Sequence, residues 1–278
     1  MHRWHASTAL CLSWLVCLAA TDGAAQAPES IFPDKNLEAA IRRVLPEAKG
    51  ALTEQHLAQV HILEAKAVGI RRLAGLEKCR NLSLLNLADN EIEELTPLAG
   101  LQKLQSLDVS HNRVADLTPL AKVANLQYLN LASNRISDLR PLANLNALSA
   151  LYLANNQIRD LGPLASLSRL VSLDVSKNLV SDLGPLAKLT RLNTLNVSDN
   201  QVSDLRPIAG LPELRLLILE RNRIQDLSPL VEACRRDAAG PRSFTPFLRV
   251  YLAGNPLSSQ AKQQVAELHQ LGVRIETE

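Results

Sequence analysis

The residue types that most often do chemistry are few in this sequence and stand far apart. Four histidines lie beyond the first 25 residues, and no His-x-x-x-His, Ser-His-Asp or Cys-His spacing joins them. The same part of the chain holds two cysteines, Cys79 and Cys234, without zinc-ligand spacing. We therefore expect no catalytic residue, no metal site and no cofactor. The histidines are His56, His61, His111 and His269.

The most regular feature of the chain is an asparagine that recurs every 22 residues, at positions 90, 112, 134, 156, 178, 200 and 222. Each stands in the frame L-x-x-L-x-L-x-x-N-x-L, with valine or isoleucine replacing leucine at some places. This is the leucine-rich-repeat pattern, and it predicts a solenoid whose stacked coils each supply one strand to a parallel sheet.

The repeat around Asn112 shows what each part of a coil is expected to do. Leu107 and Val109 alternate as in a short strand with one face inward. Asn112 follows the strand, where its amide can bond to backbone groups of its own and adjacent coils. Asp116 and Pro119 suit the start of a tight 3-10 turn on the convex side. The asparagines would thus form a hydrogen-bonded spine.

Both ends of the repeat array depart from the pattern. Val68 stands where the first coil would carry its asparagine, and after Asn222 the spacing lengthens to reach Asn255. We interpret the added segment "CRRDAAGPRSFTP" as a loop, with Cys234 the more accessible thiol and Cys79 packed inside. Seven coils separate the two cysteines, so we expect no disulfide between them.

Amphipathic helices are expected to cap the two ends of the solenoid. At the first, Asp34 would cap a helix with Leu37, Ile41 and Leu45 on one stripe. At the second, Ser258 or Ser259 would cap a helix that Gly272 ends, and "VRI" would add a last strand. Ala261, Val265 and Leu268 would form the stripe of this second helix.

The first residues look like a signal peptide. Arg3 precedes the apolar run "TALCLSWLVCLAA", which is short for a membrane span, and small residues follow it. Cleavage is expected after Ala25, with Ala27 as the alternative, and no further span follows in the processed chain. With 30 lysines and arginines against 28 acidic residues, no strong field favours nucleic acid.

The sequence therefore predicts an α/β solenoid, a right-handed leucine-rich-repeat horseshoe with strands on its concave face and 3-10 turns on its convex face. The expected divisions are a signal peptide (1–25), a helical cap with a degenerate first repeat (26–80), seven repeats (81–231), and a C-terminal region (232–278). That last region would hold the long loop, the last repeat and a helix-strand cap.

Side chains of the strands that face solvent are the candidate partner-binding residues. Tyr128 and Tyr152 lie on adjacent strands and could form one aromatic patch, although they could also merely pair with each other. Leu216, Ile218 and Tyr251 could form a second patch unless the loop 232–246 covers the first two. The full candidate set is Tyr128, Tyr152, Asp108, Asn130, Asp174, Leu216, Ile218, Glu220, Arg249 and Tyr251.

Paired-carboxylate chemistry is not expected on this face. Asp108 and Asp174 would stand three coils apart, roughly 14 Å at the usual strand spacing, which is too far for such a pair.

The segment "IFPDKNLEAAIRRVL", followed by the repeated "DLxPLAxL", resembles the internalins, which are secreted and surface leucine-rich-repeat proteins of bacteria. The resemblance covers about residues 31–230 and implies a helical N-terminal cap and protein binding on the concave face. After the repeats the sequence shows neither the family's immunoglobulin-like module nor its wall-sorting motif, so we do not expect wall attachment. Its repeat also resembles the leucine-rich regulatory subunit of protein phosphatase 1, an intracellular family that the signal peptide disfavours.

We expect an exported protein, secreted or periplasmic, that is not an enzyme and binds a protein ligand on its concave face. A glycan-binding or structural module of the cell envelope is the alternative. A third hypothesis is an enzyme in the 232–246 loop, which would need polar residues converging near Cys234. The sequence indicates neither the partner's identity nor the oligomeric state.

Overall fold

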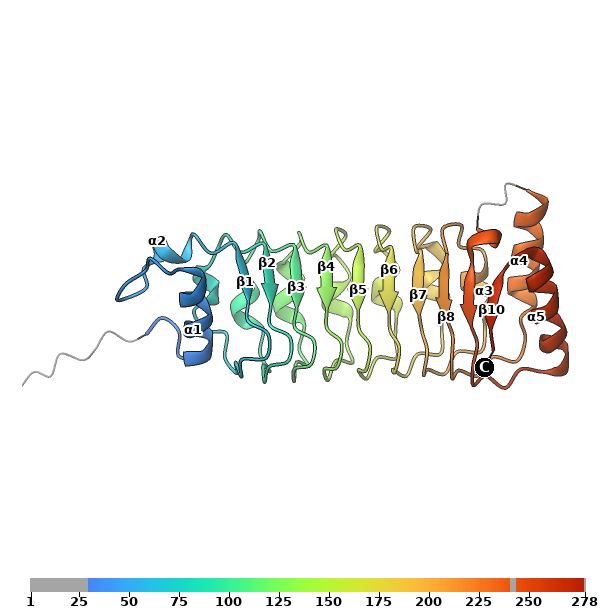
Figure 1. Ribbon diagram of the computed structural model, residues 1–278, viewed down its shortest axis with the longest axis horizontal. Coiled ribbons are helices and arrows are strands. Elements are labelled where there is room, and N and C mark those ends of the chain that lie inside the picture. Colours follow the sequence, from blue (N-terminus) through green and yellow to red (C-terminus); the bar gives the residue numbers. More distant parts are fainter. Residues whose placement is uncertain (1–29, 241–243, 278) are drawn as a thin grey trace, which may run out of the picture.

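A computed structural model describes residues 30–240 and 244–277 of the chain, so the predicted signal peptide lies outside the described residues. Ten parallel strands of three residues each form one sheet in chain order (Figure 1). This confirms the predicted leucine-rich-repeat solenoid. The strands are β1 (Ile62–Glu64), β2 (Leu84–Asn86), β3 (Ser106–Asp108), β4 (Tyr128–Asn130), β5 (Ala150–Tyr152), β6 (Ser172–Asp174), β7 (Thr194–Asn196), β8 (Leu216–Ile218), β9 (Arg249–Tyr251) and β10 (Arg274–Glu276).

The pairing register of the sheet stacks equivalent residues of successive coils. Leu107 pairs with Leu85 on one side and with Leu129 on the other, and all three are buried. Because every strand repeats this arrangement, the core is a stack of aliphatic layers that removes the leucine and valine side chains from water. One strand of a coil could not bury its inner face alone.

Short helical turns close each coil on the side opposite the sheet. Asp116 accepts a hydrogen bond from the Thr118 N–H at 2.8 Å, and Pro119 follows at the start of the turn, as predicted. In the described ranges, seven turns are 3-10, whereas the coil that contains Pro207 uses a short α-helix and the coil that contains Pro229 a longer one, described below. The 3-10 turns and the short helix are η1 (Leu76–Lys78), η2 (Thr96–Leu98), η3 (Thr118–Lys122), η4 (Arg140–Leu142), η5 (Gly162–Leu164), η6 (Gly184–Lys188), α3 (Arg206–Ala209) and η7 (Thr245–Phe247).

The predicted asparagine spine is present. The Asn112 amide nitrogen donates to the carbonyls of Val109 and Ser110 in its own coil and of Leu87 in the preceding coil, each at 3.0 Å. Its oxygen accepts from the Ile92 N–H at 2.9 Å. A single buried side chain therefore supplies the acceptor for the Ile92 N–H and one donor to each of three backbone carbonyls.

The spine also explains how the array tolerates its irregular ends. The Asn90 oxygen accepts from the N–H groups of both Val68 and Ile70, so the first coil needs no asparagine of its own. After the longer spacing, Asn255 still accepts from the Ile224 N–H at 3.1 Å. The ladder is therefore continuous from the first coil to the last.

One residue per coil adopts a left-handed backbone just before the spine asparagine. These residues have φ between 50° and 57° although none is a glycine, and Gly254, with φ 73°, takes the position in the last coil. The chain must reverse sharply there to leave the strand, which fixes the backbone whatever the residue type. The residues are Ala67, Asp89, His111, Ser133, Asn155, Lys177, Asp199 and Arg221.

Helices α1 (Lys35–Val44) and α2 (Glu54–Leu57) cap the first coil (Figure 1). Asp34 caps α1 as predicted, accepting from the N–H groups of Asn36 and Leu37. Its second oxygen accepts from the N–H groups of Arg71 at 2.8 Å and Arg72 at 3.1 Å. One carboxylate therefore starts the helix and fastens it to the first coil, while the predicted stripe Leu37, Ile41 and Leu45 is buried.

A close backbone approach follows from this docking. Gly75 has φ 102°, and a Cβ there would lie 2.6 Å from the carbonyl oxygen of Ile31 and 2.5 Å from the Phe32 ring. Only glycine fits both the backbone angle and the space.

Helix α5 (Ser259–Leu271) covers the other end, followed by β10 (Figure 1). Ser258 is the N-cap and accepts from the Ala261 N–H at 3.1 Å, and Gly272 ends the helix with φ 101°. Ala261 and Leu268 are buried, and Val265 packs partly buried against the core.

The interpretation of the C-terminal insertion as a loop is wrong for much of its length. Helix α4 (Ser228–Ala239) occupies it and packs beside α5, where Arg235 pairs with Glu267. Pro229 stands at the start of α4, as the prolines of earlier coils stand at the start of their turns. The next strand begins farther along the chain than in those coils, so the helix can continue. The longer helix α4 packs against α5, which is distant in sequence, so the local pattern did not predict it.

Cys234 is fully buried on α4, so its predicted accessibility is also wrong. Cys79 is fully buried as predicted, and both thiols are free. Burial raises the pKa of Cys79 to about 12 and that of Cys234 to about 11. Neither sulfur is a ready nucleophile at neutral pH.

Candidate protein-binding face

Two columns of outward side chains cross the ten strands, and we call them together the strand face. In the register of the sheet, each residue lies beside its equivalent on the next strand, about 4.8 Å away. The first column is Ile62, Leu84, Ser106, Tyr128, Ala150, Ser172, Thr194, Leu216, Arg249 and Arg274. The second is Glu64, Asn86, Asp108, Asn130, Tyr152, Asp174, Asn196, Ile218, Tyr251 and Glu276.

The acidic and amide side chains of the second column form hydrogen bonds with their neighbours on the strand face. Asp108 accepts from the Ser110 N–H at 2.9 Å, and its other oxygen accepts from the Asn130 amide at 3.0 Å. Asp174 makes the same pair of bonds, with the Ser176 N–H and the Asn196 amide. These side chains are engaged with their neighbours and present a small, ordered polar surface.

Tyr128 and Tyr152 interrupt this polar surface. They lie diagonally on β4 and β5, since Tyr128 pairs with Ala150 and Tyr152 with Asn130. Their ring centroids are 5.6 Å apart with the planes at 47°, and both side chains are half-exposed. Burial, together with the nearby Asp108 carboxylate and Tyr152, raises the pKa of Tyr128. The rings pair with each other and still present area to solvent.

The C-terminal candidates also reach the surface. Leu216, Ile218 and Tyr251 are half-exposed on neighbouring strands, so the described residues do not bury Leu216 and Ile218, as one interpretation of the sequence had it. Glu220 lies 3.4 Å from the Arg221 guanidinium, while Arg249 is exposed.

Three neighbours of these residues were not among the sequence candidates. Phe247, which is 60% exposed, lies under the Arg215 guanidinium, whose carbon is 5.4 Å from the ring centroid. Arg274 lies directly beside Arg249 on the last strand. The "VRI" strand could have indicated Arg274, but the position of Phe247 depends on how α4 packs.

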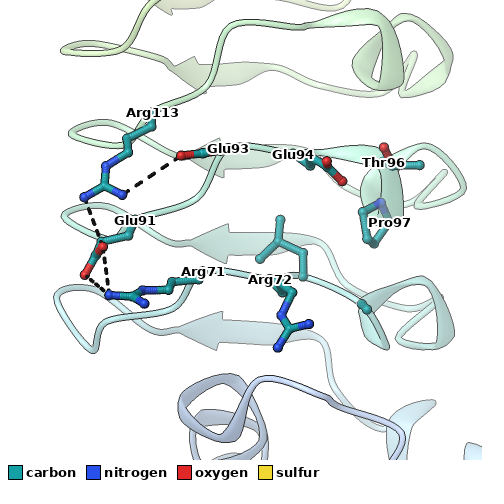
Figure 2. Close-up of a pocket in the computed structure, with 10 residues that line it drawn as sticks. Arg71, Arg72, Glu91, Glu93, Glu94, Thr96, Pro97 and Arg113 are labelled. Carbon is teal, nitrogen blue, oxygen red and sulfur yellow. Dashed lines mark hydrogen bonds and ion pairs between the residues drawn. The ribbon is translucent and has the colours of Figure 1, made fainter.

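A pocket of about 740 Å³ lies away from the strand face and is lined by residues of the first three coils (Figure 2). Figure 2 shows Glu91 between Arg71 and Arg113, with nitrogen to oxygen distances of 3.2 and 3.0 Å. The pocket opens where the first coil has Ala74 and Gly75 instead of the threonine-proline pair of the next coil. Its charges largely pair with one another, so we assign no ligand to it.

Two further results concern the described ranges, 30–240 and 244–277. Within them, no three histidine, cysteine or acidic side chains gather as a metal site would require. No helix in the same ranges has the length and apolar character needed to cross a bilayer.

The repeats match the family model described as "Leucine Rich repeats (2 copies)" over residues 80–122, 124–166, 147–188, 168–210 and 190–232. Internalin C2 of Listeria monocytogenes is 38% identical, with a TM-score of 0.71, over 73% of this chain and 91% of that one. The chain belongs to the internalin-like leucine-rich-repeat proteins.

Other solved structures share the fold of this internalin-like protein. Internalin F of Listeria monocytogenes is 26% identical over 89% of this chain and 90% of that chain, with a TM-score of 0.56. The ectodomain of the Arabidopsis thaliana receptor kinase GASSHO1/SCHENGEN3 is 22% identical over 74% of this chain and 25% of that chain, with a TM-score of 0.60. None of the curated proteins matches the internalin-like chain significantly. Leucine-rich-repeat proteins generally serve as protein-interaction modules.

Proposed function

We propose that this internalin-like protein is exported and acts as a non-catalytic module that binds a protein partner on its strand face. The observation that carries the proposal is the Tyr128–Tyr152 pair, two half-exposed rings within an otherwise small and polar surface. Tyrosine combines a large apolar area with a hydroxyl and loses little conformational freedom on binding, which is why it is enriched at interface hot spots.

The surrounding residues support the same function. Asp108 and Asn130 are held by hydrogen bonds before any partner arrives, so ordering them costs little on binding. The rigid sheet beneath fixes the two rings relative to each other. Export rests on the signal-peptide pattern of residues 1–25 and on the family.

The test is affinity capture from envelope and culture-medium fractions, with the chain from Gln26 as bait. The matched variant is Tyr128→Ala combined with Tyr152→Ala. The control is Val44→Ala combined with Val171→Ala, which removes exposed apolar area outside the two columns of the strand face. Circular dichroism should show all three proteins folded.

We expect the parent and the control to capture the same protein and the tyrosine variant to bind it more than about 30-fold more weakly. Equal capture by the tyrosine variant would show that Tyr128 and Tyr152 do not contribute to the interface. Failure of every bait to capture a protein, together with sugar-competed binding of envelope glycan that needs the tyrosines, would favour the glycan-binding alternative.

A further inference from the structure

The strand face carries one electrostatic conflict, at its C-terminal end. Arg249 on β9 and Arg274 on β10 are direct neighbours in the first column, and both side chains are exposed. Like charges directly opposite each other on adjacent strands destabilise a sheet. In the two columns of the ten strands, no other adjacent pair carries the same charge.

No carboxylate of the described residues pairs with these two arginines. Within the described part of the chain, neither guanidinium lies within 4.0 Å of a carboxylate oxygen. The backbone of Arg215 lies beside that of Arg249, because the Arg215 carbonyl accepts from the Arg249 N–H at 2.8 Å, and its guanidinium lies over Phe247. Its only carboxylate contact there is with Glu213, at 3.8 Å.

Apolar groups border the three arginines. Phe247, 60% exposed, lies under the Arg215 guanidinium, and Leu216 lies beside Arg249 on the next strand. Tyr251 follows two residues after Arg249 on the same face of β9. Arginine with aromatic and aliphatic neighbours is the composition of an interface centre, where guanidinium groups bind carboxylates in a fork.

We propose that this corner, formed by Arg215, Phe247, Arg249 and Arg274, docks an acidic, extended segment of a partner protein. The inference rests on the proposed function and names the chemistry of that partner. Carboxylates would neutralise the Arg249–Arg274 pair, and an apolar side chain would cover Phe247. Acidic residues border the corner, with Glu276 two residues beyond Arg274 and Glu213 beside Arg215, so a short acidic segment fits it better than a long polyanion.

The test uses fluorescence anisotropy with a fluorescein-labelled hexaglutamate peptide and a length-matched hexaglutamine peptide. The test variant is Arg249→Gln combined with Arg274→Gln. The control is Arg159→Gln combined with Arg169→Gln, which removes two exposed, unpaired arginines from other coils. Both variants change the net charge equally.

We expect the parent and the control to bind hexaglutamate, the test variant to bind it about tenfold more weakly, and none to bind hexaglutamine. Rising salt should weaken the parent's binding. Equal affinity of the test variant and the control, or no binding of hexaglutamate by the parent, would overturn the proposal. So would tighter binding of a labelled hexathymidylate through the same arginines.

A further variant separates binding from folding. Arg274→Glu places a carboxylate beside Arg249 and removes the repulsion, so its melting temperature should equal or exceed that of the parent while hexaglutamate binding is lost. A lower melting temperature would show that Arg249 and Arg274 do not repel each other in the free protein, against the proposal. The captured partner distinguishes the two hypotheses, because capture that needs Tyr128 and Tyr152 but not Arg249 and Arg274 keeps the proposed function and rejects this corner.

Discussion

Individual residues of the repeat differ in how far their roles could be predicted from the sequence. The spine role of Asn112 followed from its period and from the two-sided hydrogen bonding of an amide. The left-handed backbone of Lys177 did not, because the preceding strand imposes it and the residue type changes from coil to coil. The burial of Cys234 depends on α4 and α5 packing together, which no local pattern records.

The first prediction concerns one spine residue. Asn178 is buried, donates to three carbonyls and accepts from the Ile158 N–H. Asn178→Ala leaves the Ile158 N–H without an acceptor and removes one donor from each of the three carbonyls, so we expect the free energy of unfolding to fall by about 2 kcal/mol or more in urea titrations.

Asn146→Ala is the matched control, since Asn146 is exposed on the convex side. It should change stability by less than about 0.5 kcal/mol. Similar losses in both variants would mean that the spine contributes little and that the aliphatic layers alone hold the coils together.

At the scale of elements, the two caps show what sequence patterns can and cannot predict. The helix cap Asp34 and the terminator Gly272 were predicted, and Ser258 was one of two predicted caps, because capping is a local property of a few residues. The attachment of Asp34 to Arg71 was not, because it joins segments 37 residues apart. Helix α4 was not predicted for the same reason, because it packs against α5, which follows β9 in the chain.

The second prediction uses the charge of Asp34. Burial acts to raise the pKa of this carboxyl, but hydrogen bonds from the N–H groups of Arg71, Arg72, Leu37 and Asn36 outweigh it and hold the pKa below 3.8. A group whose pKa is lowered by folding stabilises the folded state above its unfolded pKa and loses this contribution as pH falls. The contribution of Asp34 should therefore be complete above about pH 5 and decline below about pH 4.

Asp34→Asn should lower the free energy of unfolding by about 2 kcal/mol at pH 7, and this loss should shrink as the pH falls below 4. Urea titrations between pH 3 and pH 7 measure it, and hydrogen exchange should show the loss first in α1. Asp160→Asn is the control, because Asp160 is exposed and accepts only from the Gly162 N–H. A loss of stability in Asp34→Asn that does not change with pH would mean that the charge of Asp34 does not contribute to stability.

The whole molecule is a row of coils in which each touches mainly its neighbours (Figure 1). Its fold was predictable because one local pattern repeats, so that the coarse architecture follows from the period alone. The strand-face candidates were also predictable as positions, because alternation decides which side chains point outward. The arginine corner was only partly predictable, since Arg215 and Phe247 meet through the packing of the last coils.

The third prediction tests whether this row unfolds as one unit. The chain from Gln26 carries only Cys79 and Cys234, which lie near its opposite ends and are fully buried. Because the spine and the aliphatic layers run without a break between them, we expect both thiols to become reactive at the same urea concentration.

Pulsed alkylation followed by peptide mapping measures the two sites separately. In native buffer both should react more than about a hundredfold more slowly than free cysteine. Labelling of Cys234 at a lower urea concentration than Cys79 would show that the C-terminal end opens independently of the rest.

The continuous spine makes the length of the protein adjustable in fixed increments. Excising one complete period between Tyr152 and Leu216 would leave every remaining asparagine facing an equivalent neighbour. The aromatic pair and the arginine corner would then approach each other by about 4.8 Å, one strand spacing. The number of repeats between the two sites thus sets their separation. Adding or removing repeats could match that separation to the dimensions of a ligand while both sites keep their residues.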